Sequence, residues 1–163
     1  MASSTSKKVV AVRFERESVS GFVNPQTYLQ PDGIEVLTAG GSVAILPYSE
    51  VKALCFVREF GSGESWKPNL VFTARPKNEG LWVRFRFRDG DAIDGVVSSN
   101  LLTHEPQGFT MTPPDAGGTT AARMFLPKAA VSEVQVLGVI GSAARRASRK
   151  PRRAAEGQLK MFE

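Results

Sequence analysis

Four side chains that could bind phosphates and bases occur at every second position: Trp82, Arg84, Arg86 and Arg88. Alternation with apolar residues at a period of two places them on one face of a strand, and we call them the arginine stripe. Guanidinium groups can bind phosphates while an indole ring stacks on a base, so the stripe is a candidate nucleic-acid-binding surface. The alternative is a solvent-exposed strand face whose arginines pair with acidic residues of the same chain.

The last part of the chain carries all of the excess basic charge. The chain holds 21 Lys and Arg residues and 16 Asp and Glu residues, a formal charge of +5. Seven of the basic and two of the acidic residues lie in 141–163, which leaves 14 of each sign in a neutral body, 1–140. Residues 145–156 lack large apolar side chains, a composition typical of disorder. The basic residues of this tail that could contact DNA are Arg145, Arg146, Arg149, Lys150, Arg152 and Arg153.

Beyond this basic segment come three large apolar side chains, Leu159, Met161 and Phe162. Apolar residues at the end of a solvated tail have no core of their own to join, and such clusters typically bind a groove on a partner protein. The alternative is that they fold back onto the body as a final strand or turn. A further alternative is a groove on a protein other than the partner that the motif described next implies.

The segment Gln158-Leu159-Lys160-Met161-Phe162 resembles the bacterial sliding-clamp-binding peptide, Gln-Leu-x-Leu/Met-Phe. In that family the Gln binds the rim of a hydrophobic cleft on the DNA polymerase III β ring, and the apolar residues fill its pockets. The resemblance implies that Gln158, Leu159, Met161 and Phe162 bind the clamp, with Lys160 at the variable position. It also implies a role in DNA replication or repair, in which the basic tail could contact DNA inside the ring.

Catalytic and metal chemistry have little support in the sequence. His104 has no adjacent nucleophile and Cys55 lies in an apolar run, so both are expected to be structural. Asp89, Asp91 and Asp94 could offer oxygens to a cation, but the remaining ligands of a calcium loop are missing and a solvated hairpin turn is expected. We therefore expect a protein that is not an enzyme and that holds neither a metal nor a cofactor.

The hydrophobic pattern predicts an all-β fold without a long helix. Short apolar or alternating runs are separated by Gly, Pro, Asn and Asp, as in small sandwiches and barrels. The clearest expected strands are residues 8–14, 33–38, 42–46, 82–88 and 131–137. In the fourth of these Val83, Phe85 and Phe87 should face the core. Short helical turns are expected only at residues 48–53 and 128–131.

The chain also contains an internal repeat. Residues 45–57 align with residues 125–137 through a Leu-Pro step and a Val four positions after the Pro. Gly33 aligns with Gly108, and the sequence around residues 12–14 aligns with residues 85–87. The repeat divides the chain into a first β module, a linker, a second β module, a disordered basic linker and a terminal peptide. These segments are residues 1–60, 61–80, 81–140, 141–157 and 158–163.

Each module should contain about five strands and is small for an independent core, so the two modules are expected to pack together. Asp89-Gly90 followed by Gly95 resembles the first hairpin of Sm-like and SH3-like barrels. Residues 51–60 resemble a bacterial family of uncharacterised tandem Sm-like or SH3-like modules. This resemblance covers residues 8–138 and implies two small packed barrels, with no known activity.

No apolar run approaches the roughly 18–20 residues of a membrane span, and residues 1–8 lack the apolar core of a secretory signal. We therefore expect a cytoplasmic protein, for which association with the nucleoid is an open alternative. The favoured function is a non-enzymatic accessory or regulatory protein that docks on the sliding clamp. The alternatives are an Sm-like nucleic-acid-binding module that uses the stripe and the tail, and a scaffold that binds a different protein.

Overall fold

The computed structural model describes residues 6–60, 70–114 and 121–141, which contain β-strands and two short 3-10 helices but no α-helix. The all-β prediction is confirmed, and each of the five expected strands is present. The strands of the first half are β1 (Lys7–Arg13), β2 (Val19–Val23), β3 (Leu29–Gln30), β4 (Gly33–Thr38), β5 (Val43–Leu46) and β6 (Val51–Val57). The elements of the second half are β7 (Gly80–Phe87), β8 (Ala92–Val97), η2 (Leu101–Thr103), β9 (Gly108–Met111), β10 (Ala121–Pro127), η3 (Lys128–Ala130) and β11 (Val131–Ile140).

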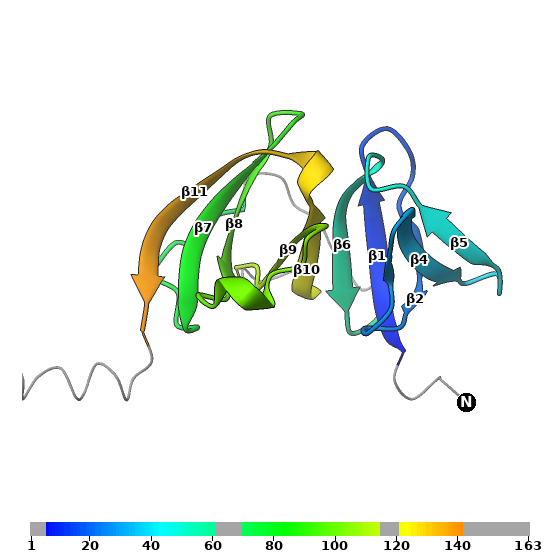
Figure 1. Cartoon of the computed structure of the whole chain (residues 1–163), viewed down its shortest axis with the longest axis horizontal. Helices are drawn as coiled ribbons and strands as arrows, with labels where there is room; N and C mark the ends of the chain where they lie inside the picture. Colours follow the sequence, from blue (N-terminus) through cyan, green and yellow to red (C-terminus); the bar gives the residue numbers. More distant parts are fainter. Residues whose placement is uncertain (1–5, 61–69, 115–120, 142–163) are drawn as a thin grey trace, which may run out of the picture.

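The first unit is an antiparallel sheet in the order β6-β1-β2-β4-β5, with the short β3 also paired to β4. The second unit has β11-β7-β8 as one sheet and β9 paired with β10, and a bridge between Val96 and Thr112 joins β8 to the end of β9. In chain order, both units therefore follow the same pairing: fifth strand, first, second, third, fourth. Figure 1 shows the two curled units side by side, with β6 and β10 between them.

Both units carry a bulge at the same place in the fifth strand. The register of β6 against β1 shifts at Lys52, between Val51 and Ala53, and the register of β11 against β7 shifts at Ser132, between Val131 and Glu133. These residues are equivalent in the predicted alignment of 45–57 with 125–137. The strand pairing thus supports that alignment independently of sequence similarity.

The predicted alignment around residues 12–14 is wrong by one position. Ala11 lies opposite Val19 in the first unit, and Phe85 lies opposite Ile93 in the second. Ala11, rather than Val12, is therefore the equivalent of Phe85. Alternation could not fix the register, because both faces of β1 are apolar and one of them packs toward the second unit. The residues on that face and just beyond it are Val10, Val12 and Phe14.

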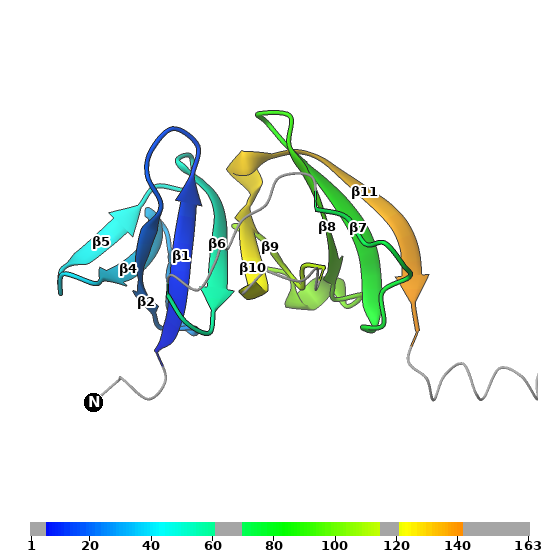
Figure 2. The ribbon, with the colours of Figure 1, turned by 180° about the vertical axis from the view of Figure 1, so that it is seen from behind.

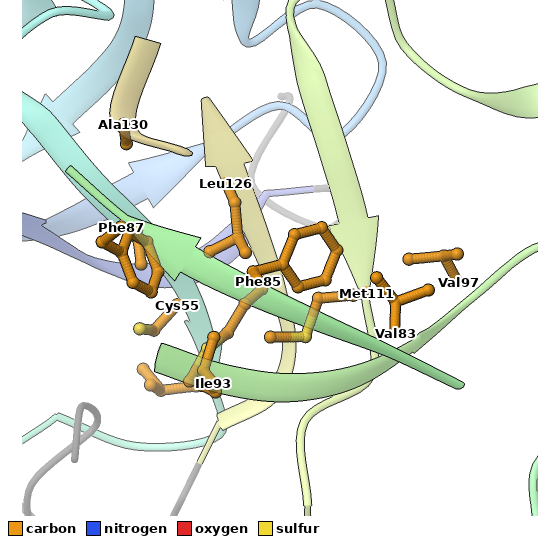
Figure 3. Packing of buried hydrophobic residues seen from close by; sticks show 12 residues of the cluster. Cys55, Val83, Phe85, Phe87, Ile93, Val97, Met111, Leu126 and Ala130 are labelled. Carbon is orange, nitrogen blue, oxygen red and sulfur yellow. The ribbon is translucent and has the colours of Figure 1, made fainter. Parts of the chain in front are cut away.

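The two units share a continuous sheet through the antiparallel pair β6–β10. Every residue of β6 is buried. Leu54 and Phe56 belong to the apolar cluster of the first unit, whereas Ala53 and Cys55 belong to that of the second. Figure 3 shows Cys55 among the side chains of the second cluster. The thiol is therefore a buried core group, and residues 51–53, expected in a helical turn, instead lie in this strand.

The second unit also includes the end of the predicted linker. Leu70 forms a parallel bridge with Ile93, and its carbonyl accepts a hydrogen bond of 2.8 Å from the backbone N–H of Asp94. Arg75 donates to the carbonyl oxygen of Val139 on β11 at 2.8 Å. The described part of the linker thus lies against the strands that follow it. In the described parts of the chain, no helix has the length and apolar character that a membrane span requires.

Gly33 and Gly108 begin the third strand of their units and hold equivalent close contacts. A Cβ at Gly33 would lie 2.2 Å from the carbonyl oxygen of Leu46, and a Cβ at Gly108 would lie 2.2 Å from that of Leu126. Real Cβ atoms do not approach an oxygen so closely, so each site requires the residue without a side chain. The two glycines let the third and fourth strands come together.

We expect Gly108→Ala to lower the free energy of unfolding by about 1–3 kcal/mol, the usual cost of an overpacked site. The added methyl group has no space, because backbone rather than a flexible side chain meets it. Urea denaturation measures the effect. Gly40→Ala is the control, since its Cβ would meet nothing closer than the Thr38 hydroxyl at 3.9 Å. Equal losses in the two variants would contradict the packing argument.

Candidate functional site

The sequence predictions for the tail fall outside the described residues. They concern the clamp-binding residues and the basic residues that precede them, and they stay predictions. These residues are Gln158, Leu159, Met161 and Phe162, together with Arg145, Arg146, Arg149, Lys150, Arg152 and Arg153. The candidate sites that the structure does describe lie on the second unit and at the junction of the two units.

The first half of the arginine stripe is tied to a fully buried carboxylate, that of Asp94 on β8. Arg84 donates to it through two nitrogens, Nε to Oδ1 at 2.7 Å and Nη2 to Oδ2 at 3.2 Å. The Trp82 indole N–H and the Phe72 backbone N–H also donate to Oδ2, at 3.2 and 3.3 Å. Four donors thus satisfy one buried charge, as burial of an ion requires.

This pairing also favours the charged form of the arginine. The side-chain hydrogen bond to Asp94 raises the pKa of the Arg84 guanidinium above its usual value, against the opposing effect of burial. The guanidinium and the indole therefore serve as fixed structural donors. Both groups bind Asp94 rather than projecting toward a phosphate or a base.

The second half of the stripe diverges. Arg86 is exposed and lies 3.4 Å from the exposed carboxylate of Glu133, a pair that contributes little in water. Arg88 instead turns toward the first unit and donates to the carbonyl oxygen of Ser49 at 2.7 Å. Its guanidinium lies 3.9 Å from the ring centroid of Phe14. All four stripe side chains thus have partners within the chain.

A buried lysine at the junction is a feature that the sequence did not reveal. Lys52, only 5% exposed, extends from the β6 bulge to the β7–β8 hairpin of the second unit. Its Nζ lies 2.6 Å from Asp89 and 2.5 Å from Asp91. The ring of Phe87 lies beneath it, with the centroid 5.2 Å from Nζ. A buried ammonium needs such partners, and the two carboxylates supply them across the junction.

The Lys52 cluster also accounts for the acidic hairpin. Burial raises the pKa of the Asp89 carboxyl, but hydrogen bonds from Lys52 and the backbone, together with the ammonium charge, outweigh it and leave the pKa below its ordinary value. Asp91 binds the same ammonium, and Asp94 binds Arg84. Among the described residues, no three His, Cys, Asp or Glu side chains come together in a way that could hold a metal ion.

The second unit has an open apolar groove of about 320 Å³ beside β11. His104 lines it after η2, with Nε2 2.7 Å from the carbonyl oxygen of Ser98 and its ring against Phe109. The groove can receive apolar side chains. The hydroxyl residues Ser98, Thr103 and Thr110 line a smaller hollow with His104, whose Nε2 contacts a backbone carbonyl oxygen. The residues that line it are Leu81, Val83, Phe85, Val97, Leu101, His104, Glu105, Phe109, Lys128, Val134 and Val136.

A second hollow, of about 380 Å³, is basic and lies where β1, β6 and β10 meet. All of its charged lining residues are positive: Lys7, Lys8, Arg58 and Arg123. The Arg123 guanidinium lies 4.4 Å from the ring centroid of Phe56, which also lines the hollow. This basic hollow is not evident from the sequence, because its cations come from three segments of a body whose net charge is zero. The adjacent pair Lys7-Lys8 was the one local signal.

The described body is an all-β protein built from two repeated units that share one order of five paired strands, with an ion cluster at their junction and two open hollows. The chain belongs to a family of unknown function (DUF6982), whose profile matches residues 5–138. The match spans both units and most of β11. No curated protein and no solved structure matches the chain significantly.

We expect Asp89→Asn to lower the free energy of unfolding at about pH 7, because the buried Lys52 loses a charged partner. The folded-state pKa of Asp89 lies below its unfolded value. Its contribution is therefore present above about pH 4, the ordinary pKa of Asp, and is lost as the pH falls through the folded-state pKa. The gap between wild type and variant should shrink toward about pH 3, measured by urea unfolding at each pH.

The control for this series is Asp32→Asn, which removes a carboxylate from an exposed turn. It should change the free energy of unfolding little at either pH. A wild-type to Asp89→Asn difference that stays constant from neutral to acid pH would show that the Lys52 ion pair contributes nothing to stability.

Proposed function

We propose that this protein is a non-enzymatic accessory or regulatory factor that docks on the bacterial DNA sliding clamp through its terminal peptide. The observation that carries the proposal is the match of Gln158, Leu159, Met161 and Phe162 to all four fixed positions of the clamp-binding motif. The proposal places the protein in the cytoplasm, with the replication or repair machinery.

The body supports this proposal because the charged side chains of the stripe bind groups within the chain. The stripe donors, the best candidates for a nucleic-acid surface in the sequence, bind Asp94, Glu133 and backbone carbonyls instead. The motif begins 17 positions beyond the last described residue, Gly141. A chain of that length can reach at most about 56–61 Å when fully extended. A peptide on such a tether can bind a cleft while the body stays clear of it.

The chemistry of the peptide is sufficient for moderate affinity. Burial of a Leu, Met or Phe side chain contributes roughly 1.5–3 kcal/mol each, reduced by the cost of ordering the peptide. The basic residues between the body and the motif could add contacts with the phosphates of DNA threaded through the ring. Such contacts weaken as salt is added, because they release counterions.

A peptide of residues 154–163 should bind a bacterial β clamp with a dissociation constant in the micromolar range, which corresponds to a binding free energy on the order of −7 to −8 kcal/mol. Changing Gln158 and Leu159 together to Ala should raise that constant at least about tenfold, because the apolar anchor Leu159 and the hydrogen bond of Gln158 are both lost. The matched control is Lys160→Ala, at the variable position of the motif, which should change binding little. Isothermal titration calorimetry measures all three.

Full-length protein should bind more tightly than the peptide only when DNA is threaded through the clamp. No heat of binding, and no competition with an established clamp-binding peptide, would refute the clamp proposal.

A second candidate function, binding of a nucleic-acid backbone by the body, is favoured by the basic hollow. Lys7, Lys8, Arg58 and Arg123 surround it, and the Phe56 ring lies among them. Cations around a concave surface with an aromatic ring suit a phosphodiester chain. This candidate replaces the stripe with the basic hollow as the nucleic-acid-binding surface of the body.

If the basic hollow binds nucleic acid, replacing Lys7, Lys8 and Arg58 by Gln should weaken binding of a single-stranded oligonucleotide. The slope of log affinity against log salt should fall by up to about two units, since each lost phosphate contact contributes roughly 0.7. The control is a variant with the same charge change elsewhere, Arg16, Lys77 and Lys128 to Gln, all exposed. Fluorescence anisotropy at several salt concentrations measures both. Equal effects would show that only net charge matters.

A further inference from the structure

The junction between the two units shows how a fifth strand of this fold accepts a neighbour. β6 pairs with β1 on one edge and receives β10 on the other. The side chain of Phe125 on β10 enters the apolar cluster of the first unit, where its ring lies edge-on to Tyr28 with centroids 6.1 Å apart. The fourth strand of one unit thus completes the core of the other.

The repeat assigns the two strands that lack such a neighbour. β11 is the equivalent of β6 and, in the described chain, pairs only with β7. β5 is the equivalent of β10 and pairs only with β4. Figures 1 and 2 show these two strands at opposite ends of the molecule. Arg75 binds the carbonyl of Val139 near the end of β11, so the edge under discussion is the middle of that strand.

Both unpaired edges expose β-branched apolar side chains. Val43 and Ile45 on β5 are 62% and 44% exposed, and Val134 and Val136 on β11 are 42% and 56% exposed. Proteins usually protect a free strand edge with charges, prolines or bulges. β11 has bulges between Val131 and Glu133 and between Val136 and Gly138, but the stretch between them, which includes Val134 and Val136, pairs regularly with β7. Exposed aliphatic residues on this stretch and on β5 therefore indicate strands that are normally covered.

The register of the internal junction places these four residues together. Within the chain, Phe125 lies opposite Leu54, and Arg123 lies opposite Phe56. In the repeat, Ile45 and Val43 are the equivalents of the two β10 residues. Val134 and Val136 are the equivalents of the two β6 residues. The same pairing between two chains would set Ile45 opposite Val134, and Val43 opposite Val136.

The groove of the second unit is the place that such a strand would fill. Val134 and Val136 line it together with Phe85 and Phe109. In the first unit, Phe125 is packed in the same apolar cluster as the equivalent residues Leu54 and Phe56. The side chain of Ile45 would therefore enter the groove as Phe125 enters the first core.

We propose that β5 of one chain pairs antiparallel with β11 of a second copy, which repeats the β6–β10 junction between molecules. Each copy has one edge of each kind, so the contact is head-to-tail and builds a closed ring or an open chain rather than a two-fold dimer. The occupant of the groove is Ile45 of the neighbour. This assembly does not involve the terminal peptide, so it stands or falls independently of clamp binding.

Two edge variants of the full chain test the proposal by analytical ultracentrifugation. Wild type should associate as its concentration rises, whereas Val43→Lys/Ile45→Lys and Val134→Lys/Val136→Lys should each remain monomeric, because each has lost one edge. Mixed in equal amounts, the two variants should form a heterodimer and no larger species, since one intact β5 meets one intact β11. Leu102→Lys, at a residue that is 94% exposed and lies on neither edge, should associate like wild type.

Several results would overturn the proposal. They are a wild type that is monomeric at all concentrations, association of either edge variant alone, and variants that do not combine. Disulfide trapping keeps the test valid if the lysine variants do not fold. Ile45→Cys mixed with Val134→Cys should give a cross-linked dimer under mild oxidation, whereas Ile45→Cys mixed with Gln135→Cys should give much less. Equal trapping of the two mixtures would refute the register.

Discussion

The burial of β6 on both faces holds the rest of the structure together. Alternate side chains of this one strand enter different cores, Leu54 and Phe56 the first, Ala53 and Cys55 the second. A unit of about 55 residues buries too little apolar surface to be robust alone. Sharing a fully buried strand lets two small units form one larger core, and the backbone pairing with β10 fixes their relative position.

The ions at the junction follow from that arrangement. The bulge in β6 directs Lys52 toward the second unit, and the β7–β8 hairpin answers with Asp89 and Asp91. Arg88 of the same hairpin extends in turn to the first unit, where it donates to the carbonyl oxygen of Ser49. Each unit thus places a cation on the other. These contacts join the two units in addition to the backbone pairing of β6 with β10.

Sequence reasoning succeeded where one face of a strand is apolar and failed where both are. Val83, Phe85 and Phe87 alternate with charged residues, and all three are buried as predicted. The repeat alignment of β1 with β7 is wrong by one position, because β1 has apolar residues on both faces. The Lys52 pairs and the basic hollow were invisible to pattern analysis, since they join residues that are distant in sequence, such as Lys52 and Asp89 at a separation of 37.

The β6–β10 pair has a consequence for the integrity of the chain. What holds the two halves to each other is a ladder of backbone hydrogen bonds, a shared apolar layer and the Lys52 ion pairs, none of which is the covalent link between β6 and β7. A protease that cut that link would leave a nicked protein whose two fragments stay associated. In a split form, the same fragments would reconstitute one another, each supplying half of a common core.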